Sequence, residues 1–263
     1  MQRLLERWRP YDARRLTPRE RRVEAAAAAA FAAVALGMAL LIPHARPFDP
    51  LLALALIASF ALASGVRLHL GAGFAMPTQL VLVPMLFLLP PATVPACVGL
   101  ALAGAAAVET LRGRAHPERI LTGTADAWHA VAPSLVFVAA GRPSAELEYW
   151  AVPALAVLAQ CATDLMFATF REWVGRGIAP AVQLRVIGTV YLIDACLTPL
   201  GFLIAIAVAD HAFAFVLALP LLALLAAIAD DRRRRIREAV DRLDELTVEH
   251  ERLDRAVHRI GEA

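Results

Sequence analysis

The sequence predicts an all-α protein: a polytopic membrane helical bundle of about eight transmembrane helices, followed by a C-terminal cytoplasmic coiled-coil helix. Hydrophobic residues make up 59% of the 263 residues, and the mean hydropathy is +0.60. Soluble domains contain roughly 45–50% apolar residues. Several apolar runs approach the ~20 residues that a helix needs to cross the hydrocarbon core. The 26 basic residues, all of them arginine, lie mostly between these runs.

Three segments follow from this pattern. Residues 1–22 are basic and are expected in the cytoplasm, either as a short amphipathic helix on the inner membrane surface or as a basic tail. Residues 23–229 form the transmembrane bundle, and residues 230–263 form the cytoplasmic helix. The first apolar run exceeds the ~7–15 residues of a signal-peptide core, so we interpret it as a retained span.

Pro, Gly and Arg residues separate the expected spans. The third span contains Pro77 and Pro84, and the fourth is short and rich in Gly and Ala, so either could be re-entrant. Pro133 is expected to kink the fifth span. The eight expected spans are 23–42, 51–66, 74–89, 96–110, 120–140, 149–170, 186–208 and 213–229.

The distribution of arginine predicts the orientation in the cell membrane. With the N-terminus in the cytoplasm, every inner segment carries arginine, whereas the outer loops carry only Arg46 and Arg142. This positive-inside pattern requires an even number of spans, with both termini cytoplasmic. Trp150 and Trp173 bracket the sixth span at a separation of about 35 Å along a helix, which suits two interfacial rings.

Polar side chains within spans are costly in lipid, and they therefore point to function. In this topology the polar side chains all fall in the cytoplasmic half of the membrane. They come early in spans that begin on the cytoplasmic side and late in spans that end there. Independent helices have no reason to share this depth unless the groups meet, so we predict one ligand- or proton-sensing site. Its expected members are Gln79, Asp126, His129, Gln160, Asp164 and Asp194.

Other interpretations of these residues are open. They could form a purely structural hydrogen-bond network, or His129 could bind a metal with aspartates of the cluster and Cys161. We expect no metal and no cofactor. Arg171 and Glu172, at the inner edge of the sixth span, are interpreted as interfacial groups.

The known catalytic sequence patterns that we considered do not occur. HExxH, GxSxG, GxxxxGK[ST] and GxGxxG are all absent from the sequence, so no catalytic residue is expected and the chain is not expected to be an enzyme. The cluster Arg232–Arg235 directly follows a span. We interpret it as an anchor on anionic membrane lipid, and not as a nucleic-acid site.

The C-terminal helix carries an unbroken heptad register, with apolar residues stepping by three and four. We expect it to pair in a homodimer and to receive the state of the bundle from the eighth span. His250 at a core position is expected to fix the register or the pairing. The alternative is a solvated amphipathic helix on a monomer. The seam residues are Ile236, Leu243, Leu246, His250, Leu253, Val257 and Ile260.

Five stretches carry a resemblance to a known family: Met76-Pro-Thr-Gln-Leu through Pro90, Asp126-Ala-Trp-His-Ala130, Arg171-Glu-Trp173, Gln183-Leu-Arg185 and Tyr191-Leu-Ile-Asp194. They resemble the multi-span input region at the front of actinobacterial cyclic-di-GMP signalling proteins, of the GGDEF cyclase and HD-GYP phosphodiesterase kinds. The resemblance covers roughly residues 60–263.

This resemblance implies a sensory module for signal transduction, which controls a cytoplasmic output domain in cis or in another chain. No GGDEF, HD or GAF sequence is present, so the chain itself is not expected to make or cleave the dinucleotide. A transporter or channel subunit is the alternative, because Pro-broken spans with polar groups also suit transport. A membrane enzyme acting on lipid is a third class.

Overall fold

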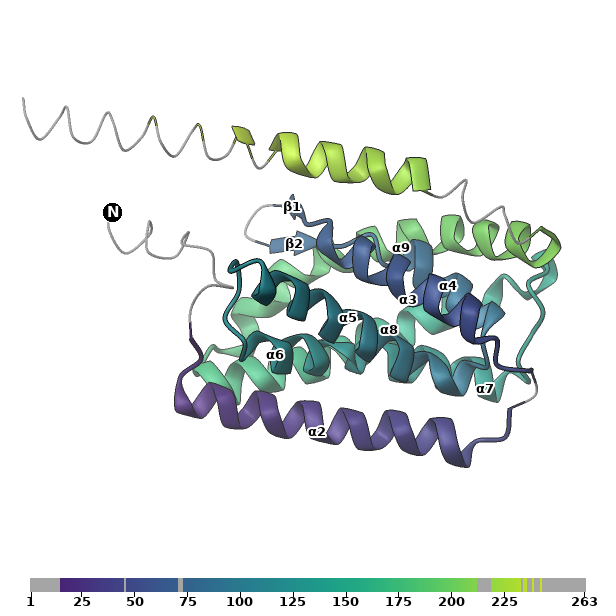
Figure 1. Cartoon of the computed structure of the whole chain (residues 1–263), viewed down its shortest axis with the longest axis horizontal. Helices are drawn as coiled ribbons and strands as arrows, with labels where there is room; N and C mark the ends of the chain where they lie inside the picture. Colours follow the sequence, from purple (N-terminus) through teal and green to yellow (C-terminus); the bar gives the residue numbers. More distant parts are fainter. Residues whose placement is uncertain are drawn as a thin grey trace, which may run out of the picture.

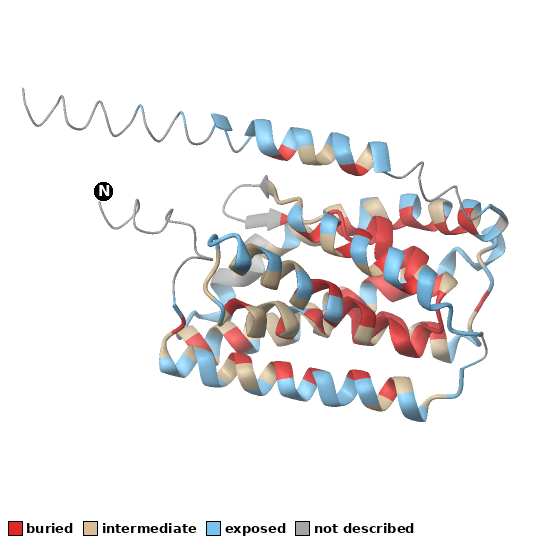
Figure 2. Cartoon of the chain, in the orientation of Figure 1, coloured by how far each residue is buried: buried red, intermediate tan, exposed pale blue. Residues whose placement is uncertain are grey.

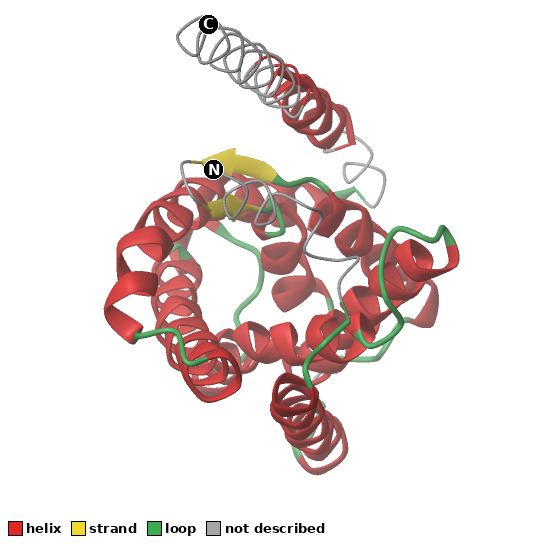
Figure 3. Ribbon diagram, turned by 90° about the vertical axis from the view of Figure 1, so that its left-hand side faces the viewer, coloured by secondary structure: helices red, strands yellow, loops and turns green. Residues whose placement is uncertain are grey.

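The computed structural model describes residues 15–44, 46–70, 73–211, 219–232, 234–235, 238 and 242. Helices dominate this part of the chain and run roughly along one long axis (Figure 1). The end-on view shows them packed side by side as a bundle, with a short two-stranded hairpin at the near end (Figure 3). The prediction of an all-α fold is therefore confirmed for the described residues, with this hairpin as an addition.

The elements follow in this order: α2 (Pro18–Leu41), α3 (Pro50–Gly65), β1 (Leu68–Leu70), β2 (Gly73–Ala75), α4 (Gln79–Leu88), η2 (Pro91–Thr93), α5 (Val94–Leu111), α6 (Arg119–Asp126), η3 (Ala127–Ala130), α7 (Val131–Ala139), η4 (Leu147–Tyr149), α8 (Ala151–Arg176) and α9 (Pro180–Asp210). Residues 219–232 are also helical. The strands pair antiparallel, with Leu68 opposite Ala75.

Local sequence signals define several helix ends. Thr17 caps α2 in a capping box with Glu20, so that two backbone N–H groups are satisfied reciprocally. Asp49 caps α3 by accepting from the first backbone N–H groups of that helix. Gly177 ends α8 with φ of 72°, a left-handed conformation that glycine adopts without steric cost.

Four helical segments are long and apolar enough to cross a membrane, namely 18–41, 91–111, 147–176 and 190–209. Large apolar side chains are exposed on them, as at Leu41 and Leu158. Figure 2 shows the same pattern on α2, whose outer face is exposed. Exposed apolar side chains on long helices suit lipid and not water, which supports the prediction of a membrane protein.

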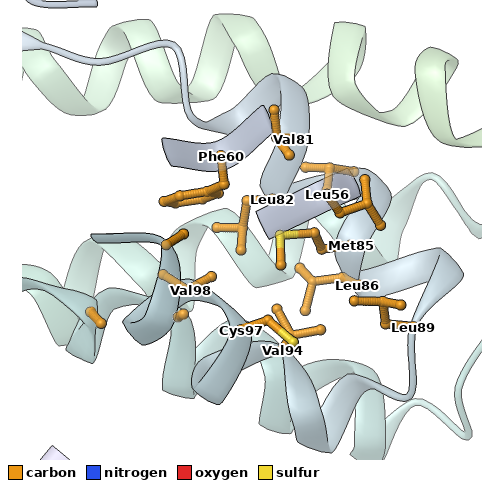
Figure 4. Packing of buried hydrophobic residues seen from close by; sticks show 14 of the residues in the cluster. Leu56, Phe60, Val81, Leu82, Met85, Leu86, Leu89, Val94, Cys97 and Val98 are labelled. Carbon is orange, nitrogen blue, oxygen red and sulfur yellow. The ribbon is translucent and has the colours of Figure 1, made fainter. Parts of the chain in front are cut away.

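Residues 74–89 do not form one membrane-crossing helix, and the re-entrant alternative stays open for this segment. These residues begin in β2, and α4 has only 10 residues, about 15 Å against a hydrocarbon core of ~30 Å. Every residue from Gln79 to Phe87 is buried. In Figure 4, Leu82 and Met85 of this helix lie among side chains of α3 and α5. Thus α4 is the packed centre of the bundle, where protein surrounds Pro84.

The expected span 120–140 is also not a single helix. It is divided into α6, the 3₁₀ turn η3 and α7. Pro133 explains the position of the break, because proline cannot donate to the carbonyl of the residue four before it, here His129, and its ring crowds that carbonyl. The break therefore falls on the stretch that holds two predicted site residues.

The loops meet in two groups, at opposite ends of the bundle. At one end, Arg46 Nη2 donates to the carbonyl of Arg142 at 2.9 Å, and Arg46 also donates to the carbonyl of Phe87 near the end of α4. At the other end, Glu118 accepts from the backbone N–H of Leu16 at 3.1 Å and from Arg21 at 3.3 Å. The chain thus passes back and forth along the bundle.

The helix at 219–232 packs on the bundle through Leu222, which is 7% exposed and belongs to the hydrophobic core. Beyond it, Arg234 and Arg235 pair with acidic residues four positions earlier, at 2.8 Å. The predicted coiled coil stays a prediction, because its seam lies outside the described residues. These seam residues are Ile236, Leu243, Leu246, His250, Leu253, Val257 and Ile260.

Glu118 makes the docking of the segment before α2 dependent on pH. Burial alone would favour its neutral form, but the hydrogen bonds from Leu16 and Arg21 prevail and hold the pKa of Glu118 below its usual range. A carboxyl with a lowered pKa in the folded state stabilises that state at neutral pH. This contribution is lost as the pH falls below about 4.

We therefore expect hydrogen exchange at the Leu16 amide, corrected for its intrinsic rate, to accelerate as the pH falls through that range. Glu118→Gln should show the faster exchange already at neutral pH. Glu109→Gln is the matched control, because the ion pairs that Glu109 makes with described residues, Arg112 and Arg114, lie on the surface. Slow exchange that persists at Leu16 in Glu118→Gln would contradict this role of Glu118.

Candidate functional site

A buried ion triad joins α2, α6 and α8. Arg171, whose side chain is 8% exposed, donates from Nη2 to Glu24 Oε2 at 2.6 Å and from Nη1 to Asp126 Oδ1 at 2.7 Å. Arg171 Nε also donates to the same oxygen of Glu24, at 3.1 Å. The Glu24 side chain is 6% exposed and that of Asp126 is 53% exposed. The triad therefore runs from the interior to the surface.

The structure adds that Arg171, interpreted as an interfacial group, is buried within the bundle, and sequence reasoning missed its partner Glu24. Glu24 lies on the stripe of α2 that also buries Ala28 and Phe31, so the helical period turns it towards the bundle. The sequence did contain a signal for the pair of Glu24 and Arg171. One carboxylate and one guanidinium lie near the inner ends of two apolar runs, at the same expected depth.

Aromatic contacts hold the turn η3 in place. Trp128 Nε1 donates to the carbonyl of Ala27 at 3.0 Å, and its ring stacks on Phe167 with centroids 4.0 Å apart. The next residue, His129, stacks on Phe60 of α3 with centroids 6.3 Å apart. Consecutive side chains of the turn are thus anchored on different helices, which fixes the orientation of the turn.

His129 connects the triad to the second part of the site. Its Nδ1 lies 2.7 Å from the backbone carbonyl of Asp126. Since a carbonyl only accepts, Nδ1 carries the proton in this contact. Within the described part of the chain, the buried Nε2 of His129 has no hydrogen-bond partner. The imidazole also interacts electrostatically with Asp164 of α8.

The second part of the site lies between α8 and α9. Tyr191 donates its hydroxyl proton to Asp164 Oδ2 at 3.0 Å. Cys161 precedes Asp164 by three residues and Asp194 follows Tyr191 by three, so each pair shares one helix face. Both aspartates interact electrostatically with each other and with Cys161. These four side chains therefore line the contact between the two helices.

Asp194 is the least supported polar group of this contact. The residue is 9% exposed, and its backbone carbonyl accepts from Thr198 Oγ1 at 2.7 Å. Its carboxylate accepts no hydrogen bond from any described residue.

The two predicted glutamines are buried but do not join the carboxylates through any described hydrogen bond. Gln79 is 1% exposed, and its Nε2 has no partner among the described residues. Gln160 is 6% exposed and lies one turn before Asp164 on α8. Of the six predicted site residues, the structure therefore links four through contacts or electrostatic interactions: Asp126, His129, Asp164 and Asp194.

The donor set limits the chemistry of this site. Among the described residues, no group of three His, Cys, Asp or Glu side chains is arranged to hold a metal ion. What converges is a set of ionisable groups in a membrane bundle, with one end half-exposed at Asp126. Such a set can exchange protons or respond to a change of charge.

Comparison with known proteins gives no match to a family model, to a curated protein or to a solved structure. Function is therefore inferred from the contacts of this chain. The geometry that matters most is two sets of polar contacts that share α8: one joins α8 to α2 and to α6 with η3, and the other joins α8 to α9.

Proposed function

We propose that the chain is a membrane-embedded sensory input module, which relays a signal through a dimeric C-terminal helix to a cytoplasmic output domain of cyclic-di-GMP type. The observation that carries this proposal is the convergence of ionisable groups from four separate segments inside the bundle. Breaking such buried contacts is costly. Groups gathered at one level suit a site whose charge state selects between two packings of the helices.

Eight passes with both termini in the cytoplasm fit this function. Arg46 and Arg142 meet at one end of the bundle. At the other end, Arg176 pairs with Glu20 at 3.0 Å and Arg21 contacts Glu118. If the arginine-rich end faces the cytoplasm, the arrangement follows the positive-inside rule. The short α4 is then a partial pass, shielded from lipid by its neighbours.

The relay runs through α9. This helix carries Tyr191 and Asp194 and packs on both α4 and α8. The chain then continues to the helix at 219–232 and to the predicted seam from Ile236 to Ile260. A change of charge between α8 and α9 shifts α9, and the downstream helix follows. Only a signal with different affinities for the two packings can drive this change.

The register of the C-terminal helix provides the test. A diguanylate cyclase fused after Ala263 reports output, and either one or seven residues are inserted after Asp231. One inserted residue turns the downstream helix by about 100°, whereas seven residues preserve the heptad. We expect the one-residue insertion to reduce the response about tenfold, which is typical of a coupling of 1–3 kcal/mol. The seven-residue insertion should restore it.

The two insertions control for each other, because both lengthen the same helix at the same site. A transporter or channel subunit would keep its substrate flux with either insertion, since transport depends on the bundle alone. Equal cyclase output from the two insertion variants would contradict the relay through the seam.

A further inference from the structure

We propose that Arg46 and Arg142 form an oxyanion-binding site at the outer end of the bundle, which takes a phosphate group from a soluble compound or from a lipid headgroup. This inference rests on the proposed function, because it names the chemical class of the signal and the side of the membrane from which the signal arrives. It is carried by two cationic side chains that bridge the same two loops without a carboxylate partner among the described residues.

The two arginines join the loop before α3 to the loop after α7, at the end of the bundle where α2 leads into α3 (Figure 1). Arg46 Nη2 donates to the carbonyl of Arg142 at 2.9 Å, and Arg46 also donates to the carbonyl of Pro143. In the opposite direction, Arg142 Nη2 donates to the carbonyl of Pro43. Both guanidinium groups therefore lie between the same two loops, and both residues are only half-buried.

No described carboxylate pairs with these charges. The acceptors that Arg46 and Arg142 find in the described part of the chain are all neutral backbone carbonyls. Acidic residues of the same loops make other contacts: Asp49 caps α3, and Glu146 accepts from Ser144 Oγ at 2.6 Å. Burial and the charge of Arg142 both lower the pKa of Arg46, as expected for a cation without a counterion.

The place of these arginines in the chain argues for a binding role. Of the 26 arginines, the expected topology puts only these two in outer loops, where the positive-inside rule disfavours them. The structure brings both to one place, although 96 positions separate them in sequence. Donation to a carbonyl needs only a neutral N–H group, so a contact between the loops does not by itself require two positive charges.

A phosphate group fits the donors that remain. A guanidinium has five N–H groups in a planar fork that matches an oxyanion. Arg46 gives three of them to carbonyls and Arg142 gives one, which leaves donors on both side chains for a ligand. The tetrahedral oxygens of phosphate can meet two forks from different directions, whereas the two oxygens of a carboxylate lie in one plane with its carbon.

The site is connected to the relay helix through α4. Arg46 donates to the carbonyl of Phe87, near the end of α4. The ring of Phe87 stacks on Phe202 of α9 with centroids 5.2 Å apart, and it meets Phe137 of α7 edge-on at 4.7 Å. A phosphate that draws Arg46 towards itself weakens the bond to Phe87, and α4 then shifts against α9. The signal thus enters outside the membrane and reaches α9 through packed side chains.

Calorimetric titration of inorganic phosphate into the whole chain in a neutral detergent tests the site. Arg142→Gln should bind phosphate about tenfold more weakly than the wild type, or weaker still, because a charge-assisted contact with the ligand is lost. Arg112→Gln is the matched control. It removes the same charge from an exposed position at the other end of the bundle, and it should leave the affinity unchanged.

A titration with phosphatidylglycerol present identifies the source of the phosphate group. Competition by the lipid assigns the site to a headgroup, and an unchanged affinity assigns it to a soluble ligand. Either result supports the oxyanion site, whereas no binding of either compound would overturn it.

Chemical modification of the wild type gives a second measurement that needs no substitution. Phenylglyoxal reacts with accessible guanidinium groups, and phosphate should slow this reaction at Arg142 but not at Arg112. If Arg142 only joined the loops, Arg142→Gln would lower the thermal stability and leave the phosphate affinity unchanged. That result, or modification of Arg142 that phosphate does not slow, would contradict the inference.

The outcomes also separate this inference from the proposed function. Phosphate binding at Arg142 together with cyclase output that ignores the helix register keeps the anion site and rejects the sensor. Register-dependent output without phosphate binding at Arg142 rejects the anion site and keeps the sensor.

Discussion

Arg171→Met is expected to destabilise the folded bundle by about 3–5 kcal/mol. The substitution removes the only cation that hydrogen-bonds to the buried Glu24 among the described residues, where Arg171 Nη2 and Nε both donate to one oxygen. A carboxylate left alone in that position loses both its charge partner and its donors. The loss of Arg171 costs less stability at Asp126, because the Asp126 side chain is 53% exposed and water can replace the lost contact.

The double substitution Glu24→Met with Arg171→Met distinguishes two causes of instability: the unpaired buried charge that Arg171→Met leaves, and the loss of the ion pair itself. Replacing both members of a buried ion pair by apolar residues of similar volume is often close to neutral, so the double variant should recover most of the lost stability. Arg235→Met is the surface control, since Arg235 and Asp231 are largely exposed and such pairs contribute about 0–1 kcal/mol. Unfolding by SDS in mixed micelles measures all three. A double variant as unstable as Arg171→Met would refute the explanation.

The long helices could be predicted because the apolar runs are themselves the signal. The expected span 23–42 and the observed α2 (Pro18–Leu41) overlap almost completely, and α8 contains most of the expected span 149–170. Length and hydropathy decide whether such a segment can cross lipid, and both are local properties. The helix was predicted to begin at residue 23 instead of Pro18, because the capping box at Thr17 lies within a polar, arginine-rich segment.

The two expected spans that differ from the structure, 74–89 and 120–140, show what local sequence patterns cannot determine. Residues 74–89 form an apolar run, and Pro77 and Pro84 indicated only that the segment could be re-entrant; the sequence does not reveal that protein covers every side of α4. Only the tertiary arrangement distinguishes a core helix from a lipid-facing one. In the expected span 120–140 the proline was recognised, but its effect reaches back four residues to the carbonyl of His129 and replaces a kink with a 3₁₀ turn.

The candidate site could be predicted in part. The spacing of Tyr191 and Asp194 on α9, and of Gln160 and Asp164 on α8, correctly placed each pair on one helix face. The bond between Arg171 and Glu24 joins residues 147 positions apart in sequence, and helical periodicity carries no information about such a pair. Gln79 shared the expected depth of the aspartates, but depth does not determine which way a side chain points around its helix.

The close approach of α9 to α4 predicts a second large effect, at Gly201. A Cβ added there would lie 2.5 Å from the backbone carbonyl oxygen of Gln79 and 3.1 Å from the Cβ of Val83. The first contact is with backbone, which cannot rotate away, and α4 is buried on all sides, so it cannot retreat. Overpacking of this kind costs about 1–3 kcal/mol, and we expect that loss for Gly201→Ala and a greater one for Gly201→Val.

The same helix offers a control of opposite sign. A Cβ added at Gly188 of α9 meets no atom within 4 Å, so Gly188→Ala should stabilise the protein by up to about 1 kcal/mol through the higher helix propensity of alanine. Unfolding in SDS compares the two variants directly. If Gly201→Ala were as stable as Gly188→Ala, α9 would be free to slide over α4. The contact between these helices would then be too loose to carry the charge state of Asp164 and Asp194 towards the C-terminal helix.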